Sequence, residues 1–273
     1  MGTKLLLANR WEWIATYKYQ QGNNKLGWID DAIPVGNYSQ DIDKQQPGNY
    51  QYDSIGNLVK DVSAGIRVID WTLYGKIRDI VKENGDSILY TYDVSGNRIS
   101  KRYLDTTTWY VRDATGNVMM TYVQRGSAPL TQLDASLYGS SRLGVINFDN
   151  QRNNIADEDV VLPGLGNGQI TNFVRGSKVF ELSNHLRNVL ATVTDKKLLG
   201  DGGLYSFDLS SAVEYYPFGM QMPGRAYESG GYRYGFNGKE NDNEVKREEN
   251  QQDYGLRIYD PRIGKFLSVD PTK

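Results

Sequence analysis

Two aspartates stand directly before prolines near the end of the chain, at Asp260-Pro261 and Asp270-Pro271. Each proline fixes its own φ and disfavours the helical region for the residue before it, so each pair ends an extended run. A carboxylate at such a point either accepts backbone N–H bonds in a turn or belongs to a reaction centre. The chain has no cysteine and one histidine, His185. Cysteine nucleophiles, histidine triads and multi-histidine metal sites are therefore excluded, and we expect no cofactor and no metal.

The charge balance limits the partners. A formal net charge of −2 argues against nucleic acid and anionic lipid as main partners, because both select strongly basic surfaces. The apolar run from Leu5 to Ala8 is too short for a signal-peptide core or a membrane span. We expect no nucleic acid partner and no membrane span. A free-standing chain would stay in the cytoplasm, whereas a piece of a longer protein would leave under a signal located elsewhere.

The elements that position the aspartates follow from an internal repeat. The motif Tyr-Asp-x-x-Gly-Asn occurs twice, as Tyr52, Asp53, Gly56 and Asn57 and as Tyr92, Asp93, Gly96 and Asn97. Turn glycines at 56, 75, 96 and 116 recur about every 20 residues. Asp can accept backbone N–H bonds, Gly adopts φ > 0 at little cost and Asn tolerates the left-handed region. Each unit therefore predicts a strand, a tight turn and a return strand.

The strands around these turns alternate between apolar and polar residues. Ile88, Tyr90 and Tyr92 fall on one face, and Arg98 and Ser100 of the next strand fall on the polar face. A single hairpin cannot bury its apolar face, so neighbouring hairpins must join into one continuous sheet. We expect an all-β fold, a spirally wound antiparallel sheet built from hairpin repeats about 20 residues long.

The repeat weakens in the middle of the chain. Residues 1–123 would hold the repeats, residues 124–179 irregular strands and loops because Gly, Asn, Asp and Ser break up their apolar runs, and residues 180–273 the terminal part. Arg187 takes the place of the turn glycine, so the turn changes type or the arginine is strained by about 1 kcal/mol or more. The charged run from Glu240 to Gln252 predicts a solvated turn or loop.

These residues resemble those of RHS proteins, also called YD-repeat proteins. The end of the chain is similar to the repeat-associated core motif of that family, approximately Tyr-Gly-x-Arg-x-Tyr-Asp-Pro-x-x-Gly-Arg-Phe-x-Ser-x-Asp-Pro, with Lys265 in place of its second arginine. The matching residues are Tyr254, Gly255, Arg257, Tyr259, Asp260, Pro261, Gly264, Phe266, Ser268, Asp270 and Pro271. The segments YYPFGM and YGFNGKENDNE resemble a Bacteroidetes-like version, and the resemblance extends from Trp11 to Pro271.

The resemblance implies a β-cocoon, a wound shell that encloses a variable C-terminal toxin domain until delivery to a neighbouring cell. In many members an aspartyl autoprotease releases that domain. Its first aspartate matches Asp270, and its second lies further along than Lys273, the last residue here. Because the pair must share a proton, so that one carboxylate activates water while the other protonates the carbonyl, we expect Asp270 to be a vestigial catalytic residue.

We therefore expect a structural part of a polymorphic-toxin shell rather than an enzyme, with its core truncated after the Ser-x-Asp-Pro motif. Its partners would be the enclosed toxin, the rest of the shell and the secretion machinery. As part of a longer protein it would be exported or held at the cell surface, and would act in competition between bacteria.

Two other functions remain open. An active autoprotease would use Asp270 with Arg257 or Arg262 and a second carboxylate, Asp260 or Asp253. The interpretation favoured for Asp260 is a turn acceptor before proline.

A carbohydrate-binding surface module is the other possibility. The chain has 20 Tyr and five Trp, and aromatic faces stack on sugars. Trp11, Trp13 and Trp28 precede the clear repeats and are the tryptophans expected to be exposed.

Overall fold

The computed structural model describes residues 15–32, 42–148, 175–229 and 231–270, which form an almost entirely β fold. Its main element is a 14-stranded sheet in which each strand pairs with its neighbours in the chain, from β3 to β16. The pairs are antiparallel, so the predicted fold class is confirmed. The strands are β3 (Tyr50–Tyr52), β4 (Leu58–Asp61), β5 (Ile66–Trp71), β6 (Ile77–Lys82), β7 (Ser87–Tyr92), β8 (Arg98–Tyr103), β9 (Thr106–Arg112), β10 (Val118–Arg125), β11 (Thr131–Tyr138), β12 (Arg142–Asn147), β13 (Lys178–Ser183), β14 (Val189–Leu199), β15 (Tyr205–Tyr215) and β16 (Gln221–Glu228).

The predicted turns join these strands. The Asp53 carboxylate accepts the backbone N–H of Gly56 at 2.6 Å and that of Asn57 at 2.8 Å. The repeat glycines have φ values in the left-handed region, which are 119° at Gly56, 70° at Gly75, 80° at Gly96 and 90° at Gly116. Arg187 has φ 63°. The turn therefore keeps its type there, and the arginine adopts a conformation that favours glycine.

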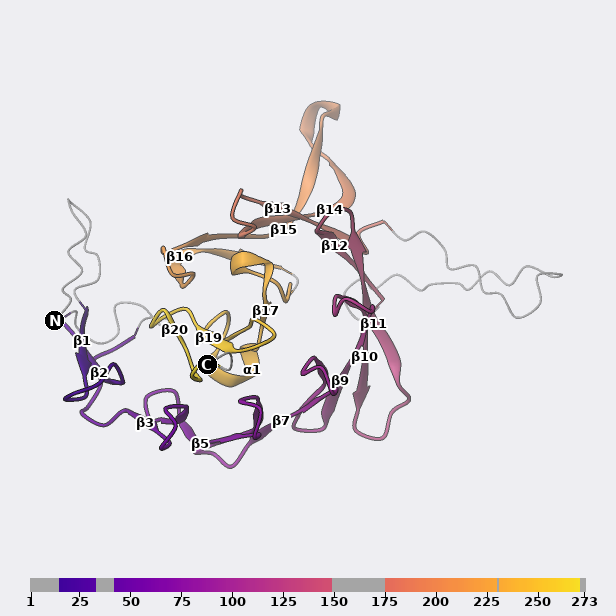
Figure 1. Ribbon diagram of the computed structural model, residues 1–273. Coiled ribbons are helices and arrows are strands. Elements are labelled where there is room, and N and C mark those ends of the chain that lie inside the picture. Colours follow the sequence, from indigo (N-terminus) through magenta and orange to yellow (C-terminus); the bar gives the residue numbers. More distant parts are fainter. Residues whose placement is uncertain (1–14, 33–41, 149–174, 230, 271–273) are drawn as a thin grey trace.

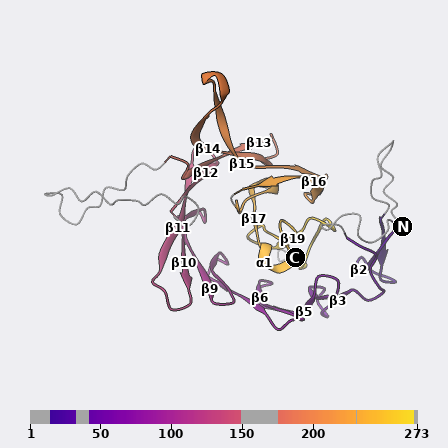
Figure 2. The ribbon, with the colours of Figure 1, turned by 180° about the vertical axis from the view of Figure 1, so that it is seen from behind.

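The large sheet curls around the C-terminal segment, residues 232–270, as Figures 1 and 2 show from opposite sides. This segment contains a four-stranded antiparallel sheet in the order β17-β18-β19-β20. Its elements are the 3-10 turn η3 (Phe236–Gly238), β17 (Glu240–Asn241), α1 (Asn243–Lys246), β18 (Gln252–Asp253), β19 (Ile258–Asp260) and β20 (Lys265–Phe266). The described part of the sheet is thus wound around its own chain.

The core lies between the concave face of the sheet and the C-terminal segment. On β5 to β7 the inward side chains are 0–2% exposed, at Ile66, Ile69, Ile77, Ile80 and Ile88. They belong to one apolar cluster with Val245, Ile258, Ile263 and Leu267. Full burial of each such side chain stabilises the fold by about 1.5–3 kcal/mol. The apolar face predicted from the repeats is therefore the face that holds the C-terminal segment.

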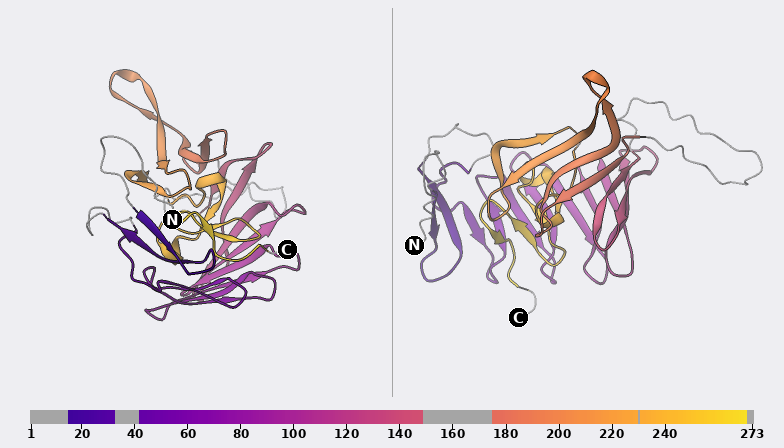
Figure 3. Two further views of the ribbon diagram at one scale, coloured as in Figure 1. Left: turned by 60° about the vertical axis from the view of Figure 1, so that its left-hand side comes forward. Right: turned by 90° about the horizontal axis from the view of Figure 1, so that it is seen from above.

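Two hairpins extend this arrangement (Figure 3). β1 (Ala15–Tyr19) and β2 (Leu26–Asp31) form a separate two-stranded sheet, and Leu26 and Ile29 join the core. The outer halves of β14 and β15 pair only with each other, as far as Leu199↔Tyr205, and project from the sheet as a ribbon that closes at the 3-10 turn η2 (Asp201–Gly203).

The middle of the chain is more regular than expected. Residues 131–147 form β11 and β12, which pair from Asp134↔Asn147 to Tyr138↔Arg142 within the large sheet. The prediction of irregular strands and loops was therefore wrong for this part, and residues 149–174 lie outside the described residues. The sheet also continues across both predicted domain boundaries. Within the residues that the structure describes, no helix is long and apolar enough to cross a membrane.

Candidate functional site

The C-terminal motif builds an aromatic cluster. Its ring centroids lie 5.4, 5.6 and 5.3 Å apart, for the pairs Tyr254–Tyr259, Tyr254–Phe266 and Tyr259–Phe266. Gly255 and Gly264, with φ of 80° and 65°, supply the two turns that return the chain so that the rings meet. The Tyr259 hydroxyl donates to the Phe218 carbonyl at 3.0 Å, between β15 and β16. The motif therefore packs its own strands together and ties them to the large sheet.

Arg257 connects this cluster to Asp270. Its guanidinium carbon lies 3.9 Å from the centroid of the Phe266 ring, and its Nη2 lies 3.7 Å from the Asp270 carboxylate. The Asp270 side chain is 42% exposed, and an exposed pair of this kind contributes about 0–1 kcal/mol. The candidate catalytic residue is thus held by an arginine at the surface, and Pro271 lies outside the described residues.

The end of the motif docks on the first repeat. The Leu58 N–H donates to the Leu267 carbonyl at 2.7 Å, and the Val269 N–H donates to the Asn57 side chain at 3.2 Å. A Cβ on Gly56 would lie 3.0 Å from the Val269 side chain. Ser268, between the two docking residues, is buried. The repeat motif and the terminal motif are therefore parts of one contact.

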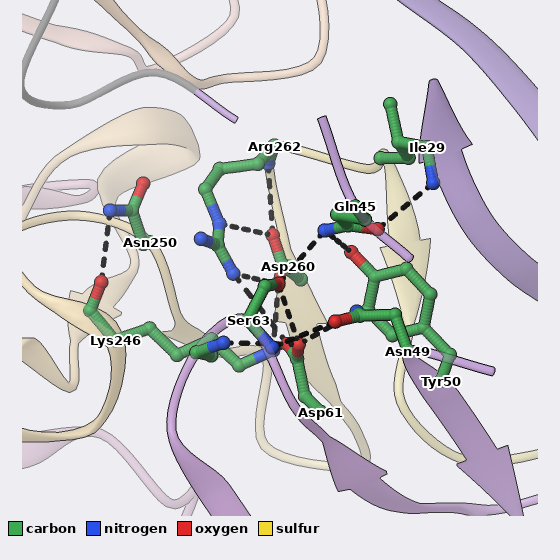
Figure 4. Close-up of polar contacts among 11 residues, drawn as sticks. Ile29, Gln45, Asn49, Tyr50, Asp61, Ser63, Lys246, Asn250, Asp260 and Arg262 are labelled. Atoms are coloured by element: carbon green, nitrogen blue, oxygen red, sulfur yellow. Dashed lines mark hydrogen bonds and ion pairs between the residues drawn. The ribbon is translucent and has the colours of Figure 1, made fainter. Parts of the chain in front are cut away.

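Asp260 is a turn acceptor, as predicted, and is also part of a buried ion cluster (Figure 4). Its Oδ1 accepts the Arg262 backbone N–H at 3.0 Å, across the turn that begins at Pro261. Lys246 Nζ donates to Asp260 at 2.8 Å and to Asp61 of β4 at 2.9 Å. Arg262 Nη2 donates to Asp260 at 3.0 Å. We call Asp61, Lys246, Asp260 and Arg262 the Lys246 clamp.

The Lys246 clamp is arranged to hold charge rather than to transfer a proton. Burial raises the pKa of Asp61, but Lys246 and Arg262 outweigh burial and hold the pKa below its usual value. Burial also raises the pKa of Asp260, but Arg262 and Lys246 have the larger combined effect and hold that pKa well below its usual value. An aspartyl dyad shares a proton because one of its pKa values is raised. These two carboxylates share an ammonium group instead.

A second buried cluster lies along β8. Arg98 makes a bidentate pair with Asp242, at 2.8 Å for both bonds, and Lys101 lies 3.3 Å from Asp242 and 3.0 Å from Glu244. Asp253 lies 3.3 Å from Arg98. Burial raises the pKa of Asp242, but Arg98 and Lys101 lower it to about 2. We call these five residues the Arg98 cluster.

A third contact joins the strands β9, β10 and β11 to the C-terminal segment. Arg233 Nη2 donates to Asp134 of β11 at 2.7 Å, and Arg233 Nη1 lies 3.6 Å from Glu240. The Tyr110 hydroxyl donates to Glu240 at 2.8 Å, and the Thr121 hydroxyl donates to Asp134 at 2.7 Å. In all three places one partner comes from the large sheet and the other from the C-terminal segment.

Sequence reasoning missed these clusters in two ways. The run from Glu240 to Gln252, predicted to be solvated, contains the buried residues Glu240, Asp242, Lys246, Gln251 and Gln252, so that prediction was wrong. Arg98, assigned to a polar face, is 2% exposed and turned to the interior. The available signal was charge complementarity, since strand residues such as Arg98 and Lys101 are opposite in sign to the acidic run.

The repeat residues serve the turns. The Asn57 and Asn97 side chains donate to Asp53 at 2.9 Å and to Asp93 at 3.1 Å. Lysine nitrogens lie near the two tyrosine rings, Lys25 5.6 Å from the Tyr52 centroid and Lys76 5.9 Å from that of Tyr92. These contacts stabilise hairpins and bring no reactive group toward a common point.

Only one of the three tryptophans expected to be exposed lies within the described residues. Trp28 is half-buried, and Trp11 and Trp13 lie outside the described residues. Trp109 on β9, which was not singled out, is 42% exposed. Among the described residues, no group of three His, Cys, Asp or Glu side chains could hold a metal ion.

Comparison with known proteins gives the fold. No family model matches the chain. It is 23% identical over 276 residues to salivary gland surface protein 1 of Aedes aegypti, across 94% of this chain and 6% of that protein. It is similar to a crystal structure of TcdB2-TccC3 without its hypervariable C-terminal region, with a TM-score of 0.57 and 16% identity. The Photorhabdus luminescens Tc holotoxin pore has a TM-score of 0.52 and 15% identity.

These similarities cover most of this chain and a small part of the others. The TcdB2-TccC3 match spans 95% of this chain and 12% of that one, and the holotoxin match spans 94% and 12%. At this identity the likeness establishes the wound β-sheet of an RHS-like shell. The resemblance of YYPFGM and YGFNGKENDNE to a Bacteroidetes-like version stays a prediction.

Proposed function

We propose that this chain is the closing part of an RHS-type shell, which helps to encapsulate and deliver a C-terminal toxin domain. The large sheet is the wall, and the C-terminal segment is anchored to its inner face. The observation that carries the proposal is the set of buried ion pairs between them, at the Lys246 clamp and the Arg98 cluster. A similar solved structure is described as lacking a hypervariable C-terminal region, which fits a variable domain beyond this core. As part of a longer protein, the chain would be exported.

The test follows a peptide placed after residue 273 in the full polypeptide that contains this chain. We expect a protease-sensitive reporter at that point to resist added protease, while the same reporter at the N-terminus is cut. Asp242→Ala, which breaks the Arg98 cluster, should expose the reporter. Equal cleavage at both ends of the unaltered protein would contradict encapsulation.

We also propose that this chain is not an active protease. Three observations support this. Asp270 is exposed beside Arg257, Asp260 is held by Arg262, and Asp253 lies 3.3 Å from Arg98. Intact mass after prolonged incubation should show one unchanged species. A fragment that appears in the unaltered chain and disappears in Asp270→Asn would restore the autoprotease.

One observation favours a second function, carbohydrate binding. Trp109 is exposed and lies directly across from Tyr122 in the register of β9 and β10. An exposed indole beside a half-buried tyrosine can stack on a sugar ring. A glycan array with the unaltered chain and Trp109→Ala checks this. Binding that the substitution removes would support it, and signal at background would exclude it.

A further inference from the structure

Glu249 differs from the acidic side chains of the clusters above. Asp61, Asp134, Asp242 and Asp260 each lie within 4.0 Å of a lysine or arginine nitrogen. Across the part of the chain that the structure describes, Glu249 makes no ion pair, and its Oε2 is shielded from solvent without a hydrogen-bond partner. A buried carboxylate without a compensating cation is costly to ionise.

Glu249 lies where the β15–β16 hairpin meets the C-terminal segment. Three polar atoms surround the α-carbon of Gly235. If this residue carried a Cβ, that atom would lie 2.9 Å from the Tyr215 hydroxyl, 3.0 Å from Asn241 Nδ2 and 3.0 Å from Glu249 Oε1. Three polar groups from β15, β17 and the loop after α1 therefore converge on one glycine. Next to them the Val189 N–H of β14 donates to the Gly235 carbonyl at 3.2 Å. The carboxyl thus sits inside a contact between the wall and the C-terminal segment.

The surroundings of Glu249 favour its neutral form. Burial is the largest influence and raises the pKa of Glu249 to about 7. The titratable and polar groups that act on it from the neighbouring elements are Tyr215 of β15, Gln221 and Glu228 of β16, and Glu248 of its own loop. Tyr215 and Gln221 favour the ionised form, whereas Glu228 and Glu248 oppose it.

The loop that carries Glu249 is bent against its conformational preference. Arg247 and Glu249 have φ of 73° and 55°, in the left-handed region that residues with a Cβ rarely adopt. The Glu249 N–H donates to the Asn243 side chain at 2.9 Å, which holds the bend. A loop in this state stays closed only while its contacts stabilise it.

We propose that Glu249 is a proton-controlled latch between the β15–β16 hairpin and the C-terminal segment, closed when its carboxyl is neutral and opened when the carboxyl ionises. This inference concerns how the segment is held and does not require that the shell encloses a toxin. In the open state the carboxyl meets water and regains its ordinary pKa of 4.5. The free-energy advantage of the closed state over the open state is therefore complete below pH 4.5 and is lost as the pH rises through about 7.

Backbone hydrogen exchange across pH 5 to 8 tests the latch in the unaltered chain, after correction for the intrinsic pH dependence of exchange. We expect protection of the Val189 and Gly235 amides to fall by up to about tenfold per pH unit up to neutrality and to level off above it. In Glu249→Gln the side chain is always neutral, so protection should stay high and constant. Glu248→Gln removes the same charge one residue earlier and should keep the pH dependence, with the transition moved to slightly lower pH because Glu248 opposes ionisation of Glu249.

Two results would overturn the proposal. One is protection that does not change with pH in the unaltered chain, and the other is Glu249→Gln following the unaltered chain. If Glu249→Gln fails to fold, Tyr215→Phe gives a second test. Because the Tyr215 hydroxyl favours the ionised form, its removal should move the opening transition to higher pH, and an unmoved or lowered transition would contradict the latch.

Discussion

Aspartates at the rim of the sheet and aspartates in its interior are stabilised in opposite ways. Asp53, Asp93 and Asp113 each head a hairpin turn and accept bonds from residues two to four positions further on. Asp61 and Asp242 instead meet cations 185 and 144 residues away in the chain. The rim aspartates are satisfied by the hairpin alone, even where they are exposed. Asp61 also accepts local bonds from Asn49, Ser63 and Ala64, but the charge of the interior aspartates is compensated only when the C-terminal segment meets the sheet.

This comparison separates two levels of information in the chain. The repeat specifies hairpins, because each turn carries its own acceptor, glycine and asparagine. The position of the C-terminal segment against the large sheet is specified by charge pairing between distant segments. A buried pair adds little net stability, but breaking one costs much because it leaves a charge uncompensated. The interior pairs therefore select one position of the segment more than they add stability.

The largest effect should follow from Asp242→Ala. The substitution leaves Arg98 and Lys101 buried without their main partner, and we expect the free energy of unfolding to fall by about 3–5 kcal/mol. Urea unfolding followed by circular dichroism measures it. The double variant Arg98→Met with Asp242→Leu replaces the pair by apolar side chains and should recover most of the loss. No recovery would mean that the pair itself, and not the uncompensated charge, supplies the stability.

Acid should produce the next largest effect, and Asp242 is the interior residue through which it is followed. The pKa of Asp242 is about 2 in the folded state and 3.8 ordinarily. Its stabilising contribution is complete above pH 3.8 and is lost as the pH falls through about 2, which for this residue amounts to about 2 kcal/mol. Urea midpoints between pH 5 and 2 measure the loss. A stability that stays constant over this range would contradict the ion-pair account of the interior.

Arg187→Gly should stabilise the rim. Because Arg187 has φ 63° in a turn that elsewhere uses glycine, we expect a gain of about 1 kcal/mol from relief of the backbone. Arg187→Ala removes the same side chain but keeps a Cβ, so it is the matched control and should bring no gain. Thermal unfolding of the two variants distinguishes them, and equal stability would show that the turn is not strained.

The smallest effect should come from Asp113→Ala at the rim. Its bonds to Thr115 and Asn117 are exposed to water, which replaces them when the carboxylate is removed. We expect a lower unfolding temperature, by less than Asp242→Ala produces. A loss as large as that from the interior would remove the distinction between the two classes.

The same division, between local turns and contacts of distant segments, separates the features that the sequence predicted from those that it did not. The turns at Gly56 and Gly96 depend on residues within five positions, so a single sequence contains all the information. The strands of residues 131–147 were expected to be irregular because Gly, Asn, Asp and Ser interrupt their apolar runs, and Gly144 is one of these residues. A Cβ there would lie 2.0 Å from the Val179 carbonyl, so the glycine permits close pairing with β13. The Lys246 clamp needed knowledge of which distant segments meet, which neither alternation nor turn chemistry supplies.

The order of the elements has a consequence for how the protein is made. Consecutive strands of the large sheet pair with each other, so a ribosome releases the wall hairpin by hairpin before it releases the segment that fills it. During that interval Asp61, Arg98 and Lys101 line a concave face that has no partner yet. Charges in that position keep water on the face and oppose its collapse or its pairing with another nascent chain. The side chains that fix the C-terminal segment in the finished fold are thus the ones that oppose aggregation of the unfinished sheet.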